Sequence, residues 1–266
     1  MSKTIGFIGG GNMGGAIMSG LVSTGTFQAE NIIAYDVLQS ALDKLSAEIG
    51  IRTTNSLELL AEESDIIVLA VKPQILPGVL EQYGEKITKD KLVIYIAAGI
   101  TMARLTGLLS AEHKIVRVMP NTPAMVGEGM SGVCVNENVS SEETELVMKI
   151  FNSFGKAELI PEKLIDAVVG VSGSSPAYVY MFIEALADGA VREGMPRAQA
   201  YKFAAQAVLG SAKMVLESGK HPGELKDMVC SPAGTTILAV QALEERGFRA
   251  AVSEAVHVSA EKNRTM

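Results

Sequence analysis

The sequence predicts an α/β protein in which an N-terminal, Rossmann-type parallel sheet is followed by a C-terminal domain made only of helices. Up to about residue 160, short apolar and β-branched runs alternate with segments of helical periodicity. The runs are continuously apolar, which is typical of parallel strands covered by helices on both faces. After Pro161 these runs stop and Ala-rich helical segments follow. We therefore predict two domains, residues 1–160 and residues 161–266.

The first domain is expected to alternate strands and helices. The predicted strands are residues 4–8, 32–35, 66–71, 92–97, 115–119, 131–136 and 157–160. The predicted helices are residues 12–24, 40–49, 56–61, 75–83 and 142–154.

The second domain is expected to contain helices at residues 163–170, 176–193, 197–218, 222–230, 235–246 and 248–262. Residues 197–216 are apolar around much of the helix circumference, so this helix must be buried in a bundle or in a subunit interface. An ordinary bundle core is the alternative, but the domain is short to bury so much apolar surface alone. We therefore favour a homo-oligomer.

Composition and charge exclude several classes of protein. The chain has 266 residues, 48% of them hydrophobic, and a net charge of −7. These values argue against disorder and against nucleic acid or an anionic membrane as a partner. Two cysteines cannot form a disulfide framework and indicate a reducing compartment. Because glycines interrupt the uncharged stretch at residues 4–29, it is not expected to be a signal peptide or a membrane span. We expect a cytoplasmic protein.

A glycine-rich loop follows the first predicted strand and opens the first predicted helix. Its sequence, Gly9-Gly10-Gly11-Asn12-Met13-Gly14, matches the G-x-G-x-x-G pattern in the setting that dinucleotide binding requires. We expect Gly9 to allow the tight turn, Gly11 to admit the pyrophosphate and Gly14 to permit close packing of helix and strand. A structural turn without a ligand is the alternative.

Asp36 ends the second predicted strand and bears on the choice of cofactor. An acidic residue at this place commonly binds the ribose hydroxyls of NAD, and its charge should repel the 2′-phosphate of NADP. No arginine follows before Arg52. Asp36 therefore favours NADH, although it could instead cap the helix at residues 40–49.

Two further loops leave the carboxyl ends of predicted strands, which is the edge where open α/β sheets bind ligands. They are Ala70-Val71-Lys72-Pro73 and Ala97-Ala98-Gly99. Lys72 would reach a phosphate or a ribose, or would simply be solvated. Asn55 would contact the adenosine half of the cofactor or cap the helix at residues 56–61, and we favour the cap.

The sequence also bears on the type of reaction. The three histidines are isolated, residues 176–193 contain no lysine, and no metal site is expected. Reduction of a ketone creates an alkoxide that needs a proton donor such as Lys or His. A protonated imine already carries its proton, so this residue set suits an imine better than a ketone.

A turn rich in small and hydroxyl residues opens the helix at residues 235–246. Ser231, Gly234, Thr235 and Thr236 lie at this helix start, where free N–H groups would hold a substrate carboxylate. A capped helix start with no ligand is an equally good interpretation of these residues.

Several motifs together closely resemble the pyrroline-5-carboxylate reductase family over essentially the whole chain. Besides the glycine loop and the two strand-end loops, they are Met119-Pro120-Asn121-Thr122-Pro123, Gly173-Ser174-Ser175-Pro176-Ala177-Tyr178, His221-Pro222-Gly223 and Ser231-Pro232-Ala233-Gly234-Thr235-Thr236. The resemblance implies hydride transfer from NADPH or NADH to the C=N carbon of 1-pyrroline-5-carboxylate, giving L-proline. It also implies a substrate-binding helical domain that forms a homodimer, which in this family often assembles into a decamer.

The resemblance further implies roles for individual residues. The residues implied to line the cofactor are Ile8, Gly9, Gly10, Gly11, Asn12, Met13, Asp36, Asn55, Ala70, Val71, Lys72, Pro73, Ala97, Ala98 and Gly99. The residues implied to hold the substrate carboxylate are Ser231, Gly234, Thr235 and Thr236, with the Thr236 hydroxyl near the ring nitrogen as the catalytic group.

The chain departs from the family pattern at two positions. Ala233 stands where the family usually has a second glycine. Asp36 stands where many members have Ser, Thr or Asn and prefer NADPH. The competing hypotheses are a β-hydroxyacid dehydrogenase, against which the missing lysine counts, and a non-catalytic NAD(P)-binding protein on the same fold.

Overall fold

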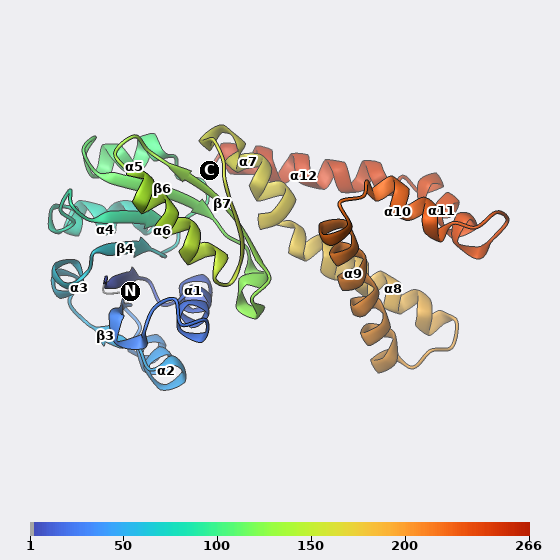
Figure 1. Ribbon diagram of the computed structural model, residues 1–266, viewed down its shortest axis with the longest axis horizontal. Coiled ribbons are helices and arrows are strands. Elements are labelled where there is room, and N and C mark those ends of the chain that lie inside the picture. The colour runs from blue at the N-terminus through green and yellow to red at the C-terminus, as the bar shows by residue number, and fades with distance from the viewer. Residues whose placement is uncertain (1–2) are drawn as a thin grey trace. The chain divides into compact units, whose positions relative to one another are not determined.

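The computed structural model describes residues 3–266, which divide into two compact units (Figure 1). The first unit contains the residues up to Ser174 together with Val258–Met266, and the second contains Ser175–His257.

The first unit is built on one eight-stranded sheet with the strand order β3-β2-β1-β4-β5-β6-β7-β8. The strands are β1 (Ile5–Ile8), β2 (Ile32–Tyr35), β3 (Arg52–Thr54), β4 (Ile66–Leu69), β5 (Leu92–Tyr95), β6 (Lys114–Met119), β7 (Gly129–Val135) and β8 (Gly155–Leu159). All neighbours are parallel except β6 and β7. The predicted α/β class with a mostly parallel sheet is confirmed.

Helices cover both faces of this sheet. They are α1 (Asn12–Ser23), α2 (Gln39–Ile49), α3 (Leu57–Glu63), α4 (Leu76–Tyr83), α5 (Met102–Leu108), α6 (Ser141–Asn152) and α7 (Ile165–Val168). One core joins α1, α2 and α6 to one face of the sheet, and a second core joins α3, α4 and α5 to the other. In β1 the two faces alternate, with Phe7 in the first core and Ile8 in the second. Burial on both faces explains why the strands are continuously apolar.

The structure differs from the sequence-based prediction at three elements. The edge strand β3 was not expected, because its three residues are polar or charged and two of them are exposed. The short helix α5 was also not expected. Strand β7 runs antiparallel to β6 because residues 120–128 are too few for a parallel crossover, which needs about a dozen.

The boundary between the compact units lies further along the chain than residue 160. The strands do end with β8, but Ile165 and Val169 are buried against Cys134 of β7 and so belong to the first unit. The final residues from Val258 onward also belong to it. Burial of Cys134, which is 1% exposed, raises the pKa of its thiol to about 11. Cys230, in the second unit, is half-buried.

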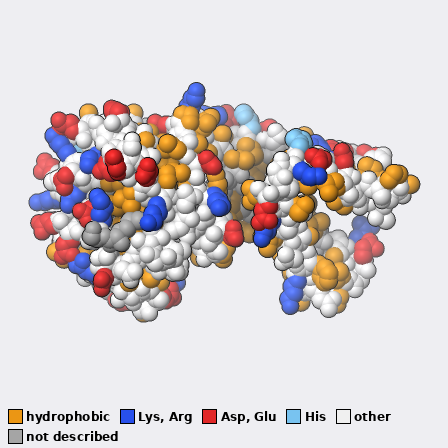
Figure 2. All heavy atoms as spheres, viewed as in Figure 1, with side chains coloured by type: hydrophobic (Ala, Val, Ile, Leu, Met, Phe, Trp, Pro, Cys, Tyr) orange, Lys and Arg blue, Asp and Glu red, His pale blue; other side chains and the backbone are white. Residues whose placement is uncertain are grey.

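The second unit consists of helices that leave most of their apolar surface exposed. They are α8 (Ser175–Arg192), α9 (Arg197–Ser218), α10 (Pro222–Val229), α11 (Thr235–Glu245) and most of α12 (Phe248–Arg264). Among its described residues only Ala187, Ala200 and Ala204 are buried. Phe203 and Leu216 of α9 are 68% and 82% exposed, and Figure 2 shows apolar side chains on the surface of these helices. Helix α9 is therefore not the buried centre of a bundle within one chain.

Within the described residues, no helix combines the length and apolar character needed to cross a bilayer. The same part of the chain holds no group of three or more His, Cys, Asp or Glu side chains arranged to bind a metal ion.

Candidate cofactor and substrate sites

The glycine loop between β1 and α1 is held tightly against β4. Gly9 has a φ of +111°, and a Cβ at this position would lie 2.7 Å from the Ala70 carbonyl oxygen. A Cβ on Gly14 would lie 2.5 Å from the carbonyl oxygen of Gly9 itself. Both positions therefore exclude any side chain, as the sequence predicts for a turn that packs helix against strand.

The middle of this loop is open, which suits a bound pyrophosphate. A Cβ on Gly11 would meet no atom within 4 Å. Gly11 is also the N-cap of α1 and supplies no side chain to bond the first N–H groups of the helix. Those donors, together with the positive end of the helix dipole, are available to an anion. The residues present thus fit a dinucleotide.

Asp36 is bound to the glycine loop. Its Oδ2 accepts a hydrogen bond from the Gly10 N–H at 2.7 Å, and its Oδ1 accepts one from the Leu38 N–H at 2.9 Å. Leu38 is the N-cap of α2, and no side chain caps that helix. The structure therefore shows Asp36 joining the ends of β1 and β2, not serving as the N-cap of α2.

A pocket of about 450 Å³ adjoins Asp36. Its apolar lining includes Val37, Leu57, Val71, Ile75 and Val79. A slot with such an apolar lining has the character of a site for a planar base. Sequence reasoning missed most of these residues, although Ile75, the N-cap of α4, and Val79 are four positions apart and so mark a shared face.

The remaining predicted cofactor residues lie at neighbouring strand ends or on the surface. Ala70 follows β4, and its N–H donates to the Ile8 carbonyl at 2.8 Å. The side chains of Lys72 and Asn55 are exposed. The expected cap at Asn55 is wrong: α3 begins one residue later than predicted, and Ser56 caps it by accepting from the Leu59 N–H at 3.1 Å.

The predicted substrate residues lie in the second unit, at the start of α11. Gly234 is the N-cap of this helix, with no side-chain hydrogen bond to the first turn. Its N–H donates to the Ser231 carbonyl at 3.0 Å, and a Cβ at this position would overlap the Ser231 hydroxyl. Thr236 is half-buried. Neither Ser231 nor Thr235 is therefore the N-cap of α11. The N-cap residue, Gly234, has no side chain to bond the first N–H groups of the helix.

Comparisons with known proteins agree on one family. Residues 162–266 match the family model described as pyrroline-5-carboxylate reductase dimerisation, and residues 4–99 match that described as NADP oxidoreductase coenzyme F420-dependent. The pyrroline-5-carboxylate reductase of Escherichia coli is 56% identical over 263 residues, which cover 99% of this chain and 98% of that protein. The enzyme of Methanosarcina acetivorans is 48% identical over 265 residues, 100% of this chain and 98% of that protein.

The chain belongs to the pyrroline-5-carboxylate reductase family. Solved structures support the assignment. The Plasmodium falciparum pyrroline carboxylate reductase with NADP bound is 37% identical, has a TM-score of 0.91, and is matched over 99% of this chain and 98% of that one. The Coxiella burnetii pyrroline-5-carboxylate reductase is 33% identical, has a TM-score of 0.92, and is matched over 100% and 98%. The chain is therefore an oxidoreductase.

In this member of the pyrroline-5-carboxylate reductase family, Ala233 has the left-handed backbone conformation that glycine adopts more readily. Its φ of +55° is the only positive value of a non-glycine residue within the described residues. Left-handed backbone costs a residue with a Cβ about 1–2 kcal/mol. The departure from the family pattern that the sequence revealed is thus also a position of backbone strain.

Replacement of Ala233 by glycine should raise the free energy of unfolding by about 0.5–1 kcal/mol. Relief of the left-handed conformation outweighs the roughly 0.5–1 kcal/mol of extra chain entropy that glycine loses on folding. Urea unfolding of the whole protein measures the difference. Ala239→Gly, an exposed position inside α11, is the control and should cost about 1 kcal/mol. A233G less stable than the native protein would contradict the expectation.

Proposed function

We propose that this chain reduces the C=N bond of 1-pyrroline-5-carboxylate with NADPH or NADH and so forms L-proline, the last step of proline biosynthesis. The observation that carries the proposal is the similarity to reductases of this name over 99–100% of the chain. The glycine loop, with its open centre at Gly11 and the uncapped start of α1, supports it because it suits a dinucleotide.

The cofactor site in this proposal is the carboxyl edge of the sheet. The backbone of Gly9–Met13 binds the pyrophosphate, Asp36 receives the adenosine ribose, and the pocket beside Asp36 receives the adenine. The full proposed set is Ile8, Gly9, Gly10, Gly11, Asn12, Met13, Asp36, Asn55, Ala70, Val71, Lys72, Pro73, Ala97, Ala98 and Gly99. When bound, the dinucleotide supplies the hydride.

The substrate site in this proposal is the start of α11. The free N–H groups of this helix and the hydroxyls of Ser231 and Thr235 hold the carboxylate, and the closed turn at Gly234 fixes their direction. The Thr236 hydroxyl binds the ring nitrogen and is the proposed catalytic group. A protonated C=N bond loses its charge on hydride addition, so the site needs no strong acid of its own.

We propose that the helical unit buries its apolar surface by pairing with the helical unit of a second copy of the chain. Its exposed apolar residues, among them Phe203 and Leu216, would be unfavourable in water and require a partner surface. The matching family model is described as a dimerisation domain. We propose a cytoplasmic homodimer that can assemble into a decamer, with residues 161–266 binding substrate and forming the interface, and no nucleic-acid or membrane partner.

One assay separates this proposal from its competitors. Oxidation of NADH or NADPH is followed with 1-pyrroline-5-carboxylate, with a 3-keto acid semialdehyde, and with neither substrate. The expected result is turnover with the pyrroline alone and formation of proline. Turnover with only the ketone-type substrate would establish a hydroxyacid dehydrogenase, and binding without any turnover would indicate a non-catalytic NAD(P)-binding protein.

We propose that Asp36 makes NADH at least comparable to NADPH as a reductant. Asp36→Asn should raise the ratio of kcat/KM for NADPH to that for NADH by about tenfold, because it removes a charge that repels the 2′-phosphate while keeping a carbonyl oxygen for a loop N–H. Steady-state kinetics with both cofactors measure the ratio. Asp43→Asn, on the exposed side of α2, is the matched control. A native preference for NADPH of about a hundredfold would overturn the proposal.

A further inference from the structure

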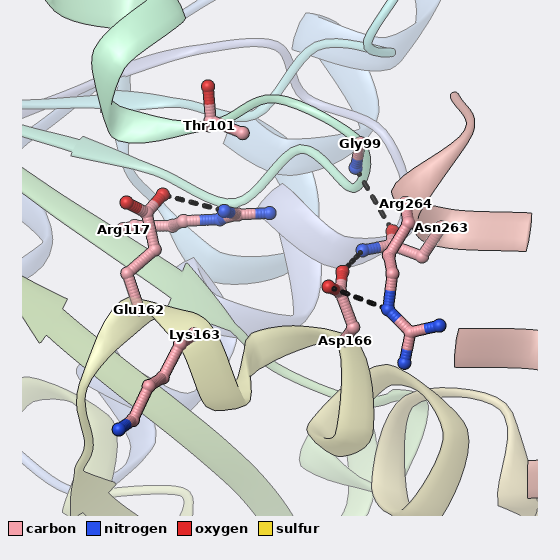
Figure 3. Close-up of a pocket in the computed structure, with 8 residues that line it drawn as sticks. All are labelled: Gly99, Thr101, Arg117, Glu162, Lys163, Asp166, Asn263 and Arg264. Carbon is pink, nitrogen blue, oxygen red and sulfur yellow. Dashed lines mark hydrogen bonds and ion pairs between the residues drawn. The ribbon is translucent and has the colours of Figure 1, made fainter. Parts of the chain in front are cut away.

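A polar pocket of about 370 Å³ adjoins the loop Ala97-Ala98-Gly99 (Figure 3). It is formed within the first unit by residues from β6, from residues 162–166 and from the last turn of α12. Two of its side chains, Arg117 and Asn263, are buried although both are polar. Buried polar side chains nearly always have hydrogen-bond partners, so the partners of Arg117 and Asn263 show which segments these two residues fix.

Asn263 connects three separate segments of the chain. Asn263 is buried, with an exposed fraction of 5%. The Asn263 Oδ1 accepts a hydrogen bond from the Gly99 N–H at 3.1 Å, and its Nδ2 donates to the Asp166 Oδ1 at 2.6 Å. The other oxygen of Asp166 lies 3.4 Å from the Arg264 Nε. Figure 3 shows the Gly99–Asn263–Asp166–Arg264 chain of interactions. Asp166 therefore fixes the orientation of the amide that binds Gly99.

Further contacts hold Gly99 and the start of α5, the helix that follows the loop. Gly99 has a φ of +72°, and a Cβ there would lie 2.8 Å from the Cβ of Met266. Three residues later, the Met102 N–H donates to the Glu162 Oε1 at 2.7 Å. That same oxygen lies 2.7 Å from the Nη1 of the buried Arg117. Asn263 thus holds the last residue of the loop, and the Arg117–Glu162 pair holds the first residue of α5, which follows it.

We infer that Asn263 is a positioning residue for the dinucleotide cofactor, acting through the backbone of Ala97–Gly99. The inference rests on the proposed function, in which this loop lines the cofactor. Removal of the amide leaves the Gly99 N–H without its partner and releases the loop from the last turn of α12. The bound dinucleotide would then have to order the loop, so its affinity falls.

Asn263→Ala should weaken dinucleotide binding roughly 5- to 30-fold, as measured by calorimetric or fluorescence titration of the whole protein with NADH and NADPH. The KM for the pyrroline substrate should change less than the KM for the cofactor. Thr265→Ala is the matched control, since the Thr265 hydroxyl is exposed and bonds only carbonyls of its own helix end. Affinity of N263A within twofold of the native protein, or an equal loss in T265A, would overturn the inference.

A charge swap supplies the second test. The single substitution Asn263→Asp places a carboxylate beside that of Asp166, so this variant should bind the cofactor poorly. The double variant N263D/D166N restores a donor opposite an acceptor, because the new amide at position 166 donates and the new carboxylate at position 263 still accepts from Gly99. Recovery of cofactor affinity in the double variant to within about threefold of the native protein is expected. A double variant no better than N263D would contradict the positioning role.

Hydrogen exchange reports on the same bond without any turnover. The Gly99 amide should exchange at least about tenfold faster in N263A than in the native protein, and its protection should return in N263D/D166N. Unchanged exchange at Gly99 would overturn the inference. Because titration and exchange need no substrate, a protein that fails to reduce the pyrroline would refute the proposed function while these two measurements still decide the role of Asn263.

Discussion

Replacement of Gly9 by alanine is expected to lower the free energy of unfolding by about 2–6 kcal/mol. Two costs add at this position: a φ of +111° that an alanine adopts only with strain, about 1–3 kcal/mol, and a Cβ placed 2.7 Å from the Ala70 carbonyl oxygen, about 1–3 kcal/mol of overpacking. The obstructing atom is backbone at the end of the central strand β4 and cannot rotate away. Urea unfolding at a fixed protein concentration measures the loss.

Gly11→Ala is the matched control for this prediction. Gly11 has an ordinary φ of −69°, and a Cβ there meets nothing within 4 Å, so the stability should stay within about 0.5 kcal/mol of the native value. Its cofactor affinity should nevertheless fall, because the added methyl group occupies the space proposed for the pyrophosphate. Equal stability of the two variants would contradict the role of Gly9, and unchanged affinity in G11A would contradict the role of Gly11.

Thr236→Ala is expected to lower kcat/KM for the pyrroline substrate by one to two orders of magnitude, about 1.4–2.7 kcal/mol of lost transition-state stabilisation. Thr236 is the second residue of α11, whose start has no side-chain cap, and it is half-buried. A hydroxyl that binds the ring nitrogen directs the C=N carbon toward the hydride donor, and its loss costs orientation.

Two conservative variants sharpen this test. Thr236→Ser keeps the hydroxyl and should retain most of the activity, whereas Thr236→Val keeps the shape without the hydroxyl and should behave like the alanine variant. The cofactor KM should stay near its native value in all three. A native kcat/KM in T236A and T236V would leave Thr236 with no part in catalysis.

Much of the sheet could be predicted because its central strands carry a strong local signal. Strands such as β1 and β4 are buried on both faces and therefore appear as unbroken apolar runs. The glycine loop was equally accessible to sequence analysis, because a turn this tight permits few residue types. Both features depend on neighbours close in the chain, which a pattern can encode.

Other features depend on contacts between distant residues and leave no such pattern. The hydrogen bond from Gly99 to Asn263 joins residues 164 positions apart, and nothing near Asn263 distinguishes it from a solvated residue of a C-terminal helix. Ile165 and Val169 have helical periodicity like the segments after them, yet they are buried with Cys134 in the first unit. The edge strand β3 carries polar and charged residues, and two of its three residues are exposed to solvent, so it lacks the apolar pattern of the buried strands.

The contrast between the two cysteines has a practical consequence. The Cys134 thiol is shielded by burial and remains protonated at neutral pH, whereas Cys230 is half-buried and directly precedes Ser231. A maleimide fluorophore should therefore attach at a single native position, next to the turn that opens α11. Because this position adjoins the turn proposed to hold the substrate carboxylate, the emission of the attached probe is expected to change when the substrate binds.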